Sequence, residues 1–310
     1  MERFLHAVSV FINHLAAVHW QLLALAVLCH VTKVACVARA WRNAVAASYP
    51  ETEVRWRTMY GGYLIGVGIN AIIPARAGDA VKLVVVKRRV DGATYPTLAA
   101  TLVLLNLFDI VVATLLLVWA SQSGLLPNLH IIRRLRAFDT DWFLEHPRET
   151  LIVLCVLLVA GLIAGIWAWR KVVAFRERVS LGFAAFRDRE YYVRHVVPWQ
   201  AADWTLRVVT IYFFLRAFAI PATAKNALLV QVSQGLSTVF PFSPSGIGTA
   251  QALIVTVLHD VASRTAILAF SVGTQITVIA VNVALGFIAM GIMLGTFDWR
   301  GHAAEDAAER

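Results

Sequence analysis

Residues 61–89 read GGYLIGVGINAIIPARAGDAVKLVVVKRR, an apolar run with closely spaced glycines that is interrupted in its middle. The interruption begins at Pro74, and Arg76, Asp79 and Lys82 follow it within a few residues. At membrane depth, irregular backbone and ionisable side chains are tolerated only where protein or a water-filled cavity shields them. This break is therefore the first candidate functional site of the chain.

The composition places the chain in a membrane. Of its 310 residues, 59% are hydrophobic and 15% are charged, and the mean hydropathy is +0.68, whereas a soluble domain carries about 25% charged residues. The formal net charge of +9 comes from basic residues in short loops between apolar segments, where such residues set topology and meet anionic lipids. The composition predicts a polytopic membrane protein and argues against a nucleic-acid partner.

The second half of the chain repeats the break. Residues 74–83 read PARAGDAVKL and residues 244–253 read PSGIGTAQAL. The two segments are identical at four positions, which are Pro74 and Pro244, Gly78 and Gly248, Ala80 and Ala250, and Leu83 and Leu253. Paired hydrophobic segments interrupted by glycine or proline in corresponding halves are typical of a transporter binding site. The pattern predicts pseudo-repeats around residues 57–120 and 226–297.

Apolar segments of about 20 residues, the length that a helical span requires, predict an all-α polytopic membrane protein. We expect about five full spans and two broken re-entrant helical hairpins that form an inverted repeat. The spans are expected at 16–37, 97–120, 151–169, 201–220 and 266–297, and the breaks within 61–89 and 227–258. Residues 1–14 and the amphipathic stretch 170–194 are expected at the membrane surface. A single transmembrane domain then covers residues 1–300, and residues 301–310 form a disordered tail.

The charge pattern indicates how the breaks lie. If each broken segment returns to the side it entered, the basic loops at 39–57, 82–89 and 170–194 share one face with the C-terminus. If each crosses fully, this asymmetry is largely lost. The positive-inside rule therefore favours re-entrant hairpins with these loops in the cytoplasm. Three crossings between the hairpins make the repeats inverted, an architecture of alternating access.

The first break has the chemistry of an anion site. A half-helix that starts near Ala77 presents free backbone N–H groups and the positive end of its dipole beside Arg76 and Lys82, which suits a lipid phosphate. Asp79 lies in the first turn, where it caps the helix or pairs with one of the two cations. The alternative is a self-satisfied ion pair that only pins the hairpin, and the two roles are compatible.

The second break carries no charge. Around Gly246 and Gly248 it offers hydroxyl and amide groups, namely those of Ser243, Ser245, Thr249 and Gln251. These groups suit hydrogen bonds to a lipid headgroup, whereas the alternative is that the glycines only allow close helix packing. Gln231, Gln234 and Gln275 either extend this polar lining or hydrogen-bond between helices, and the second role is favoured.

Three further charged residues of interest, Lys33, Asp109 and Arg207, lie inside predicted spans. An isolated charge in lipid is costly, so Asp109 and Arg207 are expected to face the interior and to have partners. The candidate partners of Asp109 are Arg76, Lys82 and Arg207, and a proton relay is a further alternative for this residue. Lys33 either extends to the nearer interface, which the sequence favours, or belongs to the site.

No recognisable catalytic constellation or metal motif is present, and no cofactor is expected. The three cysteines, Cys29, Cys36 and Cys155, are interpreted as small packing residues rather than as a disulfide or metal site. An enzyme acting on a lipid-linked substrate would have Asp79 and Asp109 as its good catalytic candidates.

The two breaks together resemble the flippase-like membrane-domain family. This family includes the transmembrane part of bacterial lysyl-phosphatidylglycerol synthetases and stand-alone relatives. The resemblance is carried by Asn70, Pro74, Arg76, Gly78 and Asp79, followed by Pro241, Pro244, Gly246, Ile247, Gly248, Thr249 and Gln251. Asp79 stands where the family usually has glutamate, Ser245 where it has glycine, and Gln251 where it has an acid. If that acid couples charge movement in relatives, such a role is in question at Gln251.

The resemblance implies that a lipid with a bulky polar headgroup moves between leaflets. We expect a flippase or scramblase for an anionic or glycosylated lipid in a bacterial cytoplasmic membrane. Arg76 and Lys82 would meet the phosphate with Asp79 positioning them, and Gly246, Gly248, Thr249 and Gln251 would form the opposing polar wall. Because the chain ends shortly after residue 297, the aminoacyl-transferase domain of the synthetases and its activity are not expected.

Two other functions stay open. One is a membrane enzyme that acts on a lipid-linked substrate. The other is a non-transporting partner that recruits a cell-envelope biosynthetic enzyme through residues 170–194. The expected partners are the lipid substrate, the surrounding membrane lipids and either a second copy of the chain or such an enzyme.

Overall fold

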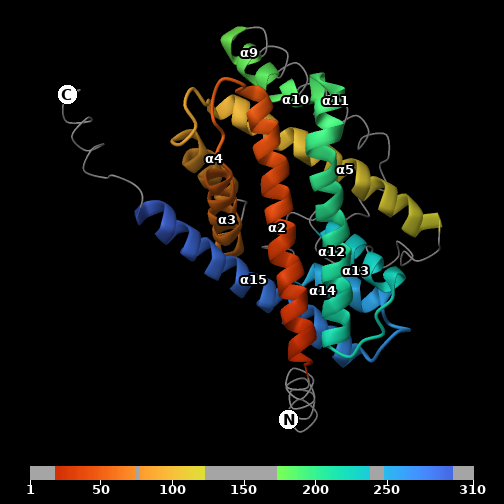
Figure 1. The fold of residues 1–310 in the computed structure, drawn as a ribbon. Coiled ribbons are helices and arrows are strands. Elements are labelled where there is room, and N and C mark those ends of the chain that lie inside the picture. Colours follow the sequence, from red (N-terminus) through yellow and green to blue (C-terminus); the bar gives the residue numbers. More distant parts are fainter. Residues whose placement is uncertain (1–17, 74–76, 123–172, 238–247, 296–310) are drawn as a thin grey trace, which may run out of the picture.

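The computed structural model describes residues 18–73, 77–122, 173–237 and 248–295, and every regular element in these ranges is a helix. Figure 1 shows them as a bundle in which long helices cross at oblique angles. Several sequence expectations lie outside the described residues. These are the interfacial segment 1–14, the span 151–169 with Cys155, the tail 301–310, and the residues Pro74, Arg76, Pro241, Ser243, Pro244, Ser245, Gly246 and Ile247 of the two breaks.

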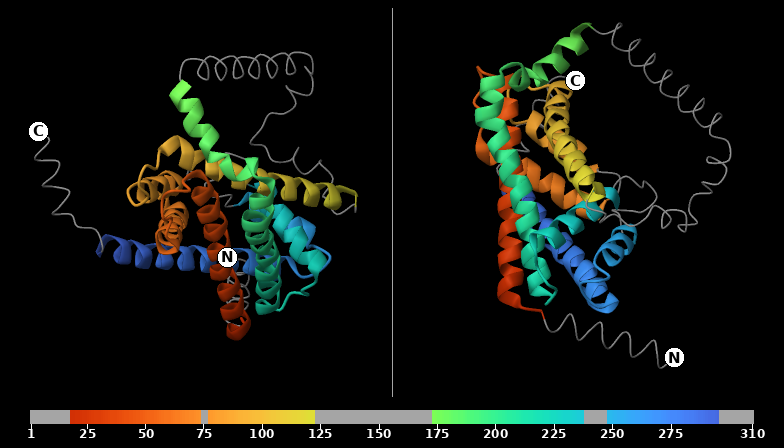
Figure 2. Two further views of the ribbon diagram at one scale, coloured as in Figure 1. Left: turned by 45° about the horizontal axis from the view of Figure 1, so that its top comes forward. Right: turned by 90° about the vertical axis from the view of Figure 1, so that its right-hand side faces the viewer.

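The fold is built along α2 (Trp20–Ser48), to which α12 (Val197–Ala217) is the main neighbour. One face of α2 is buried at helical spacing, at Ala26, His30, Val34, Ala38 and Trp41 among others. The two helices run antiparallel and side by side in all the views of Figures 1 and 2. The backbone N–H of His19 donates to the carbonyl of Ala217 at 2.9 Å, which joins the start of α2 to the end of α12.

The first break folds as a helical hairpin made of α3 (Trp56–Ile72) and α4 (Ala77–Lys87). Val54, just before the hairpin, and Val90, just after it, are buried in the same apolar cluster as Trp41. The chain therefore leaves the hairpin at the end of the molecule where it entered, which is also the end where α2 terminates. A returning hairpin rather than a full crossing is what the charge pattern predicted for this segment.

Glycines let the hairpin close. Gly66 of α3 and Gly78 of α4 face each other so closely that a Cβ atom on either would overlap the carbonyl oxygen of the other. On another face of α3, a Cβ at Gly68 would lie 2.8 Å from the Cα of Gly286 in α15 (Arg264–Gly295). The glycine spacing of the sequence thus provides two contact faces on one helix, as small residues do in membrane interfaces.

The second break is also a hairpin, formed by α13 (Ala224–Ser237) and α14 (Thr249–Val257). Gly248 precedes α14 with φ +92°, a conformation that favours glycine. Ala227 near the start of α13 and Leu258 after α14 are buried in one apolar cluster with Val18, at the end where α2 begins. The two hairpins therefore open toward opposite ends of α2.

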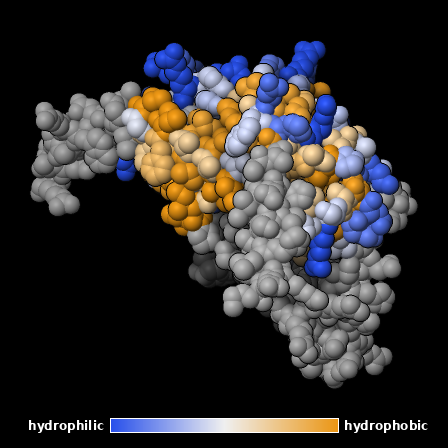
Figure 3. Space-filling view, turned by 90° about the horizontal axis from the view of Figure 1, so that it is seen from below, coloured by the Kyte–Doolittle hydropathy of each residue, from blue (hydrophilic) through white to orange (hydrophobic). Residues whose placement is uncertain are grey.

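Three described helices are long and apolar enough to cross a membrane: α2, α5 (Tyr95–Gln122) and α15. The expected span 97–120 lies within α5, the described part of the expected span 266–297 lies within α15, and α15 has no break within Arg264–Gly295. The expected span 201–220 forms α12, which carries Asp203, Arg207 and Arg216 and is not among the three. Viewed from the end where α2 begins, apolar atoms gather toward the side where α15 ends (Figure 3).

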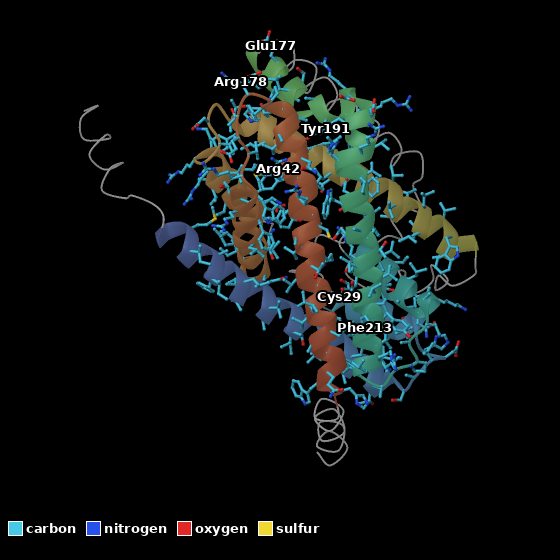
Figure 4. All side chains as sticks on the ribbon, in the orientation of Figure 1. Cys29, Arg42, Glu177, Arg178, Tyr191 and Phe213 are labelled. Atoms are coloured by element: carbon cyan, nitrogen blue, oxygen red, sulfur yellow. The ribbon has the colours of Figure 1, made fainter. Side chains whose placement is uncertain are left out.

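The basic segments gather at the end where α2 terminates. Here the chain forms α9 (Val173–Gly182), α10 (Ala184–Arg187), α11 (Arg189–Tyr191) and a π-helical turn (Tyr192–Val196). The Tyr191 hydroxyl donates to the carbonyl of Asn43 at 3.0 Å, and Arg42 donates to the carbonyl of Val54 at 2.9 Å. Figure 4 labels Arg42, Arg178 and Tyr191 at this end. The described parts of the three basic loops therefore share one end, as the charge asymmetry predicted.

The contact between Gly66 and Gly78 gives a stability prediction. We expect Gly78→Ala to lower the free energy of unfolding by about 1–3 kcal/mol, the usual cost of overpacking a close contact. Thermal unfolding in detergent measures the effect. Gly291→Ala in α15 is the matched control, because a Cβ there meets no described residue within 4 Å. Equal melting temperatures for the two variants would show that the hairpin does not depend on the close approach.

Candidate functional site

A central cavity of about 520 Å³ lies between the tips of the two hairpins. Asn70 and Ala71 line it from the end of α3, Ser237 from the end of α13, and Gln251 from the start of α14. The volume falls within the roughly 300–1,000 Å³ typical of small-molecule sites. Segments from the two halves of the chain, which the sequence repeat relates, thus contribute to one cavity.

The tip of the first hairpin is closed by Asn70. Its side-chain oxygen accepts the N–H of Gly78 at 2.8 Å, and its amide NH₂ donates to Asp79 Oδ1 at 3.0 Å. The Gly78 N–H is one of the donors that an α-helix leaves without a partner in its first turn. The expectation that this half-helix presents its N–H groups to an anion is therefore wrong for Gly78, because Asn70 already satisfies it.

Lys82 is held by its own hairpin and by α2. Its ammonium lies 2.9 Å from Asp79 Oδ1, and 4.9 Å and 5.8 Å from the ring centroids of Tyr63 and Trp41. The side chain is 9% exposed. An ion pair together with two aromatic rings is a stabilising environment for an ammonium with little access to water. The pinning ion pair that the sequence offered as one alternative is thus present, and a phosphate contact at Lys82 stays a prediction.

Asp109 pairs with Arg207, one of the three partners that the sequence left open. The guanidinium donates to Asp109 Oδ2 at 3.2 Å and, through Nε, to Asp203 Oδ2 at 2.8 Å. The indole N–H of Trp204 donates to the other Asp109 oxygen at 2.8 Å. Two carboxylates from α5 and α12 therefore share one arginine, an arrangement that compensates charge away from bulk water.

A small space joins this cluster to the first hairpin. A cavity of about 70 Å³ is lined by Asp79 and Lys82 on one side and by Asp109, Asp203 and Arg207 on the other. The structure thus brings together four of the charged residues that the sequence selected, Asp79, Lys82, Asp109 and Arg207. These residues come from three separate elements, α4, α5 and α12.

Lys33 lies near the middle of α2 and lines the central cavity, as does Arg207. The sequence favoured a Lys33 that extends to the nearer membrane interface, and the structure places it at the cavity instead. Within the described part of the chain, its ammonium takes part in no hydrogen bond or ion pair. His30, one turn earlier, is bonded to Asn282 of α15 at 2.8 Å. Lys33 is therefore the cation of the cavity wall that forms no direct ion pair among these residues, and Asp203 and Asp109 act on it only at longer range.

The tip of the second hairpin is closed by Gln251. Its side-chain oxygen accepts the N–H of Gly248 at 2.6 Å, and its amide NH₂ donates to Gln275 of α15. Gly78 and Gly248, which match in the sequence repeat, thus both donate their N–H to a side-chain amide oxygen. Gln251 fixes the start of α14 and still lines the cavity, so its neutral amide has a positioning role that needs no charge.

Part of the cavity wall was not identified from the sequence. Ser271, Thr274, Gln275 and Asn282 of α15 line the cavity, and of these only Gln275 was singled out. Their spacing of three, four and seven residues places them on one face of a helix. A polar stripe on an otherwise apolar span was the signal that could have found them. Thr210 of α12 also lines the cavity and was missed.

The described residues form no cluster typical of a metal site and no disulfide. No group of three or more His, Cys, Asp or Glu side chains there is placed to hold a metal ion. Cys29 and Cys36 are free thiols on α2. The cavity wall instead consists of ammonium, guanidinium, amide and hydroxyl groups, which bind oxygen-rich ligands through hydrogen bonds.

One protein family matches the sequence along most of its length. Residues 4–286 match the lysylphosphatidylglycerol synthase transmembrane region. No curated protein and no solved structure matches the chain. The matched range includes both interrupted segments and all the helices that line the cavity, except the last turns of α15. The chain therefore belongs to the family of the lysylphosphatidylglycerol synthase transmembrane region.

Proposed function

We propose that this protein moves a lipid with a phosphate-bearing polar headgroup between the leaflets of a bacterial cytoplasmic membrane, as a flippase or scramblase. Membership of a family of membrane regions tied to lysylphosphatidylglycerol synthases supports a lipid-related role. The observation that carries the proposal is the central cavity, which residues from both hairpin tips line together. Hairpins that open toward opposite ends of the bundle suit a site that is reached alternately from either leaflet.

Lys33 supports an anionic headgroup. A lysine at the centre of a membrane helix costs about 2.5–3.5 kcal/mol on insertion scales. Lys82 and Arg207 offset such a cost with carboxylates in direct contact, whereas Lys33 forms no direct ion pair among the described residues and feels Asp203 and Asp109 only at longer range. A water-filled cavity lowers the cost for Lys33, and a phosphate would offset it further through a charge-assisted hydrogen bond. The lysine that is costly to place in the membrane is thus also the one whose ammonium can donate hydrogen bonds to a ligand.

Neutral groups around Lys33 suit the remaining headgroup oxygens. The hydroxyls of Thr210 and Thr274 are buried and have no hydrogen-bond partner among the described residues, and both residues line the central cavity. A buried polar atom without a partner costs about 1–3 kcal/mol. Gln231 and Gln234 of α13 add amide donors and acceptors to the same wall. A headgroup rich in oxygen, either phosphate alone or phosphate with sugar or glycerol hydroxyls, matches this set.

The geometry favours transport over the enzyme alternative. Asp79 and Asp109, the carboxylates proposed for catalysis, both accept hydrogen bonds and form ion pairs. The cavity histidine His30 is bonded to Asn282. A general base needs access to a substrate proton in addition to a suitable pKa. These contacts support a positioning role for the three groups.

The inverted arrangement predicts the sides on which three exposed loop residues lie. The native cysteines are first replaced, and one cysteine is then introduced in each of three variants. Glu53→Cys and Asp91→Cys lie on either side of the first hairpin in the sequence, and Asp260→Cys follows the second hairpin. We expect a membrane-impermeant maleimide to label the first two from one side and Asp260→Cys from the other. Intact cells and inverted vesicles measure this accessibility. Labelling of positions 53 and 91 from different sides would remove the re-entrant hairpin and the alternating-access proposal.

Lys33→Gln tests the role of the unpaired cation. We expect transport of fluorescent phosphatidylglycerol in proteoliposomes to fall about tenfold or more, because a hydrogen bond to a charged group contributes about 1.5–3 kcal/mol. We also expect the melting temperature to stay the same or rise, because the variant removes a charge that is costly near the middle of a membrane helix and that forms no direct ion pair among the described residues. A merely structural lysine would lower it. Lys225→Gln on the exposed surface of α13 is the control, and equal transport rates for the two variants would refute the assignment.

A further inference from the structure

A second large space of about 630 Å³ lies beside the central cavity, between α5, α12 and α13. One wall consists of α5 side chains that include Ile110, Ala113 and Leu117, and the facing wall consists of Val232, Gly235 and Leu236 of α13. We call this space the lateral groove. Its walls are mostly apolar, in contrast to the hydrogen-bonding walls of the central cavity.

The two spaces meet at shared polar residues. Arg207, Gln231 and Gln234 line both the central cavity and the lateral groove. Asn106 and Asp109 belong to the same polar end of the groove. A polar space is thus continuous with an apolar one through a boundary that carries a guanidinium. An amphiphile with a charged group between its polar headgroup and its apolar tails presents polar, charged and apolar parts in the same order.

The length of the groove fits a lipid tail. Along α5 its lining runs from Asn106 to Leu117, which corresponds to about 16 Å at 1.5 Å per residue. Half of the roughly 30 Å hydrocarbon core of a bilayer is about 15 Å. The groove is therefore about as long as the acyl region of one leaflet. α5 also exposes large apolar side chains on its outer surface, among them Val111 and Leu115, at 58% and 63%.

From this continuity we infer that the lateral groove binds the acyl chains of the transported lipid. The phosphate then lies near Arg207 and Lys33, and the headgroup lies in the central cavity. This inference rests on the proposed function and adds the path of the tails. It predicts a substrate with acyl chains attached through a phosphate, that is, a phospholipid rather than a free phosphorylated sugar.

Gly235 is a position from which the groove can be filled. Among the described residues, a Cβ built at this glycine meets nothing within 4 Å, and the residue lines the groove. Gly235→Leu therefore places a side chain in the space proposed for the tails, and leucine also favours a helix more than glycine does. Gly291→Leu is the matched control, because Gly291 likewise has open space around its Cβ but lies on α15, away from the groove.

The test uses phosphatidylglycerol with a diazirine in one acyl chain, incorporated into proteoliposomes that contain the full chain. After illumination, mass spectrometry locates the cross-linked residues. In the wild-type protein we expect cross-links at Ala113 and Leu117 in the groove and at Leu115 on the outer surface. Gly235→Leu should reduce the groove cross-links several-fold and leave the Leu115 cross-links unchanged, whereas Gly291→Leu should change neither. Transport of the same lipid should fall only in Gly235→Leu.

The outcomes separate this inference from the proposed function. If the wild-type protein transports lipid and Gly235→Leu alters neither its groove cross-links nor its transport, the groove is not the tail site and the inference is overturned. If the lipid cross-links to Leu115 on the outer surface but to no residue of the groove, the inference is also overturned. If groove cross-links depend on Gly235 but no transport occurs, the lipid site stands and the transport proposal fails.

Discussion

The structure depends on how helix ends are satisfied inside the fold. A helix that begins within the membrane leaves backbone N–H groups without partners, and each unsatisfied group costs several kcal/mol in hydrocarbon. Both hairpin tips use a side-chain amide oxygen for this purpose. Asn70 accepts from Gly78 across the first hairpin, and Gln251 accepts from Gly248 within its own helix. With these donors satisfied, the two tips can border a cavity that remains open.

The charges around the cavities follow from the same requirement. Lys82 is compensated by Asp79, and Arg207 by Asp109 and Asp203. The Lys82–Asp79 pair lies within α4, and the Arg207–Asp109 pair links α12 to α5. The ion pairs therefore position elements of the site. Together with Lys33, the described residues bring three cations and three carboxylates to the two polar cavities. The formal charges balance, but they are unevenly distributed. Arg207 pairs with two carboxylates, whereas Lys33 forms no direct ion pair among the described residues.

The local features of the first hairpin were predictable from the sequence, because they are set by neighbouring residues. Pro74 and the glycines indicated the break, and the second half-helix begins at Ala77 as expected. The basic loops indicated a return to the same end, and the described parts of those loops share it. The partner of Asp109 could not be chosen, because Arg207 lies 98 residues away and the register between α5 and α12 is a tertiary property.

The lining of the central cavity was harder to predict. Lys33 was placed near an interface because a lysine side chain can extend along a helix. The sequence does not show that α3, α12 and α15 surround it to form a cavity. The polar stripe on α15 was overlooked, because Ser271, Thr274 and Asn282 are each common in membrane interfaces and only their spacing is informative. Asn70 was selected through the family motif, whereas its hydrogen bond with Gly78 depends on how the two helices of the hairpin pack.

The unequal compensation of Lys33 and Arg207 has a consequence for how an anion would move. At Arg207 a phosphate competes with two carboxylates, one of them at 2.6 Å, so binding there is offset by the loss of existing ion pairs. At Lys33 no described carboxylate has to be displaced. A ligand would therefore gain more at Lys33 and less at Arg207, which lies at the boundary with the lateral groove. Because transport requires release as well as binding, a strong interior contact beside a weak boundary contact suits passage better than two strong ones.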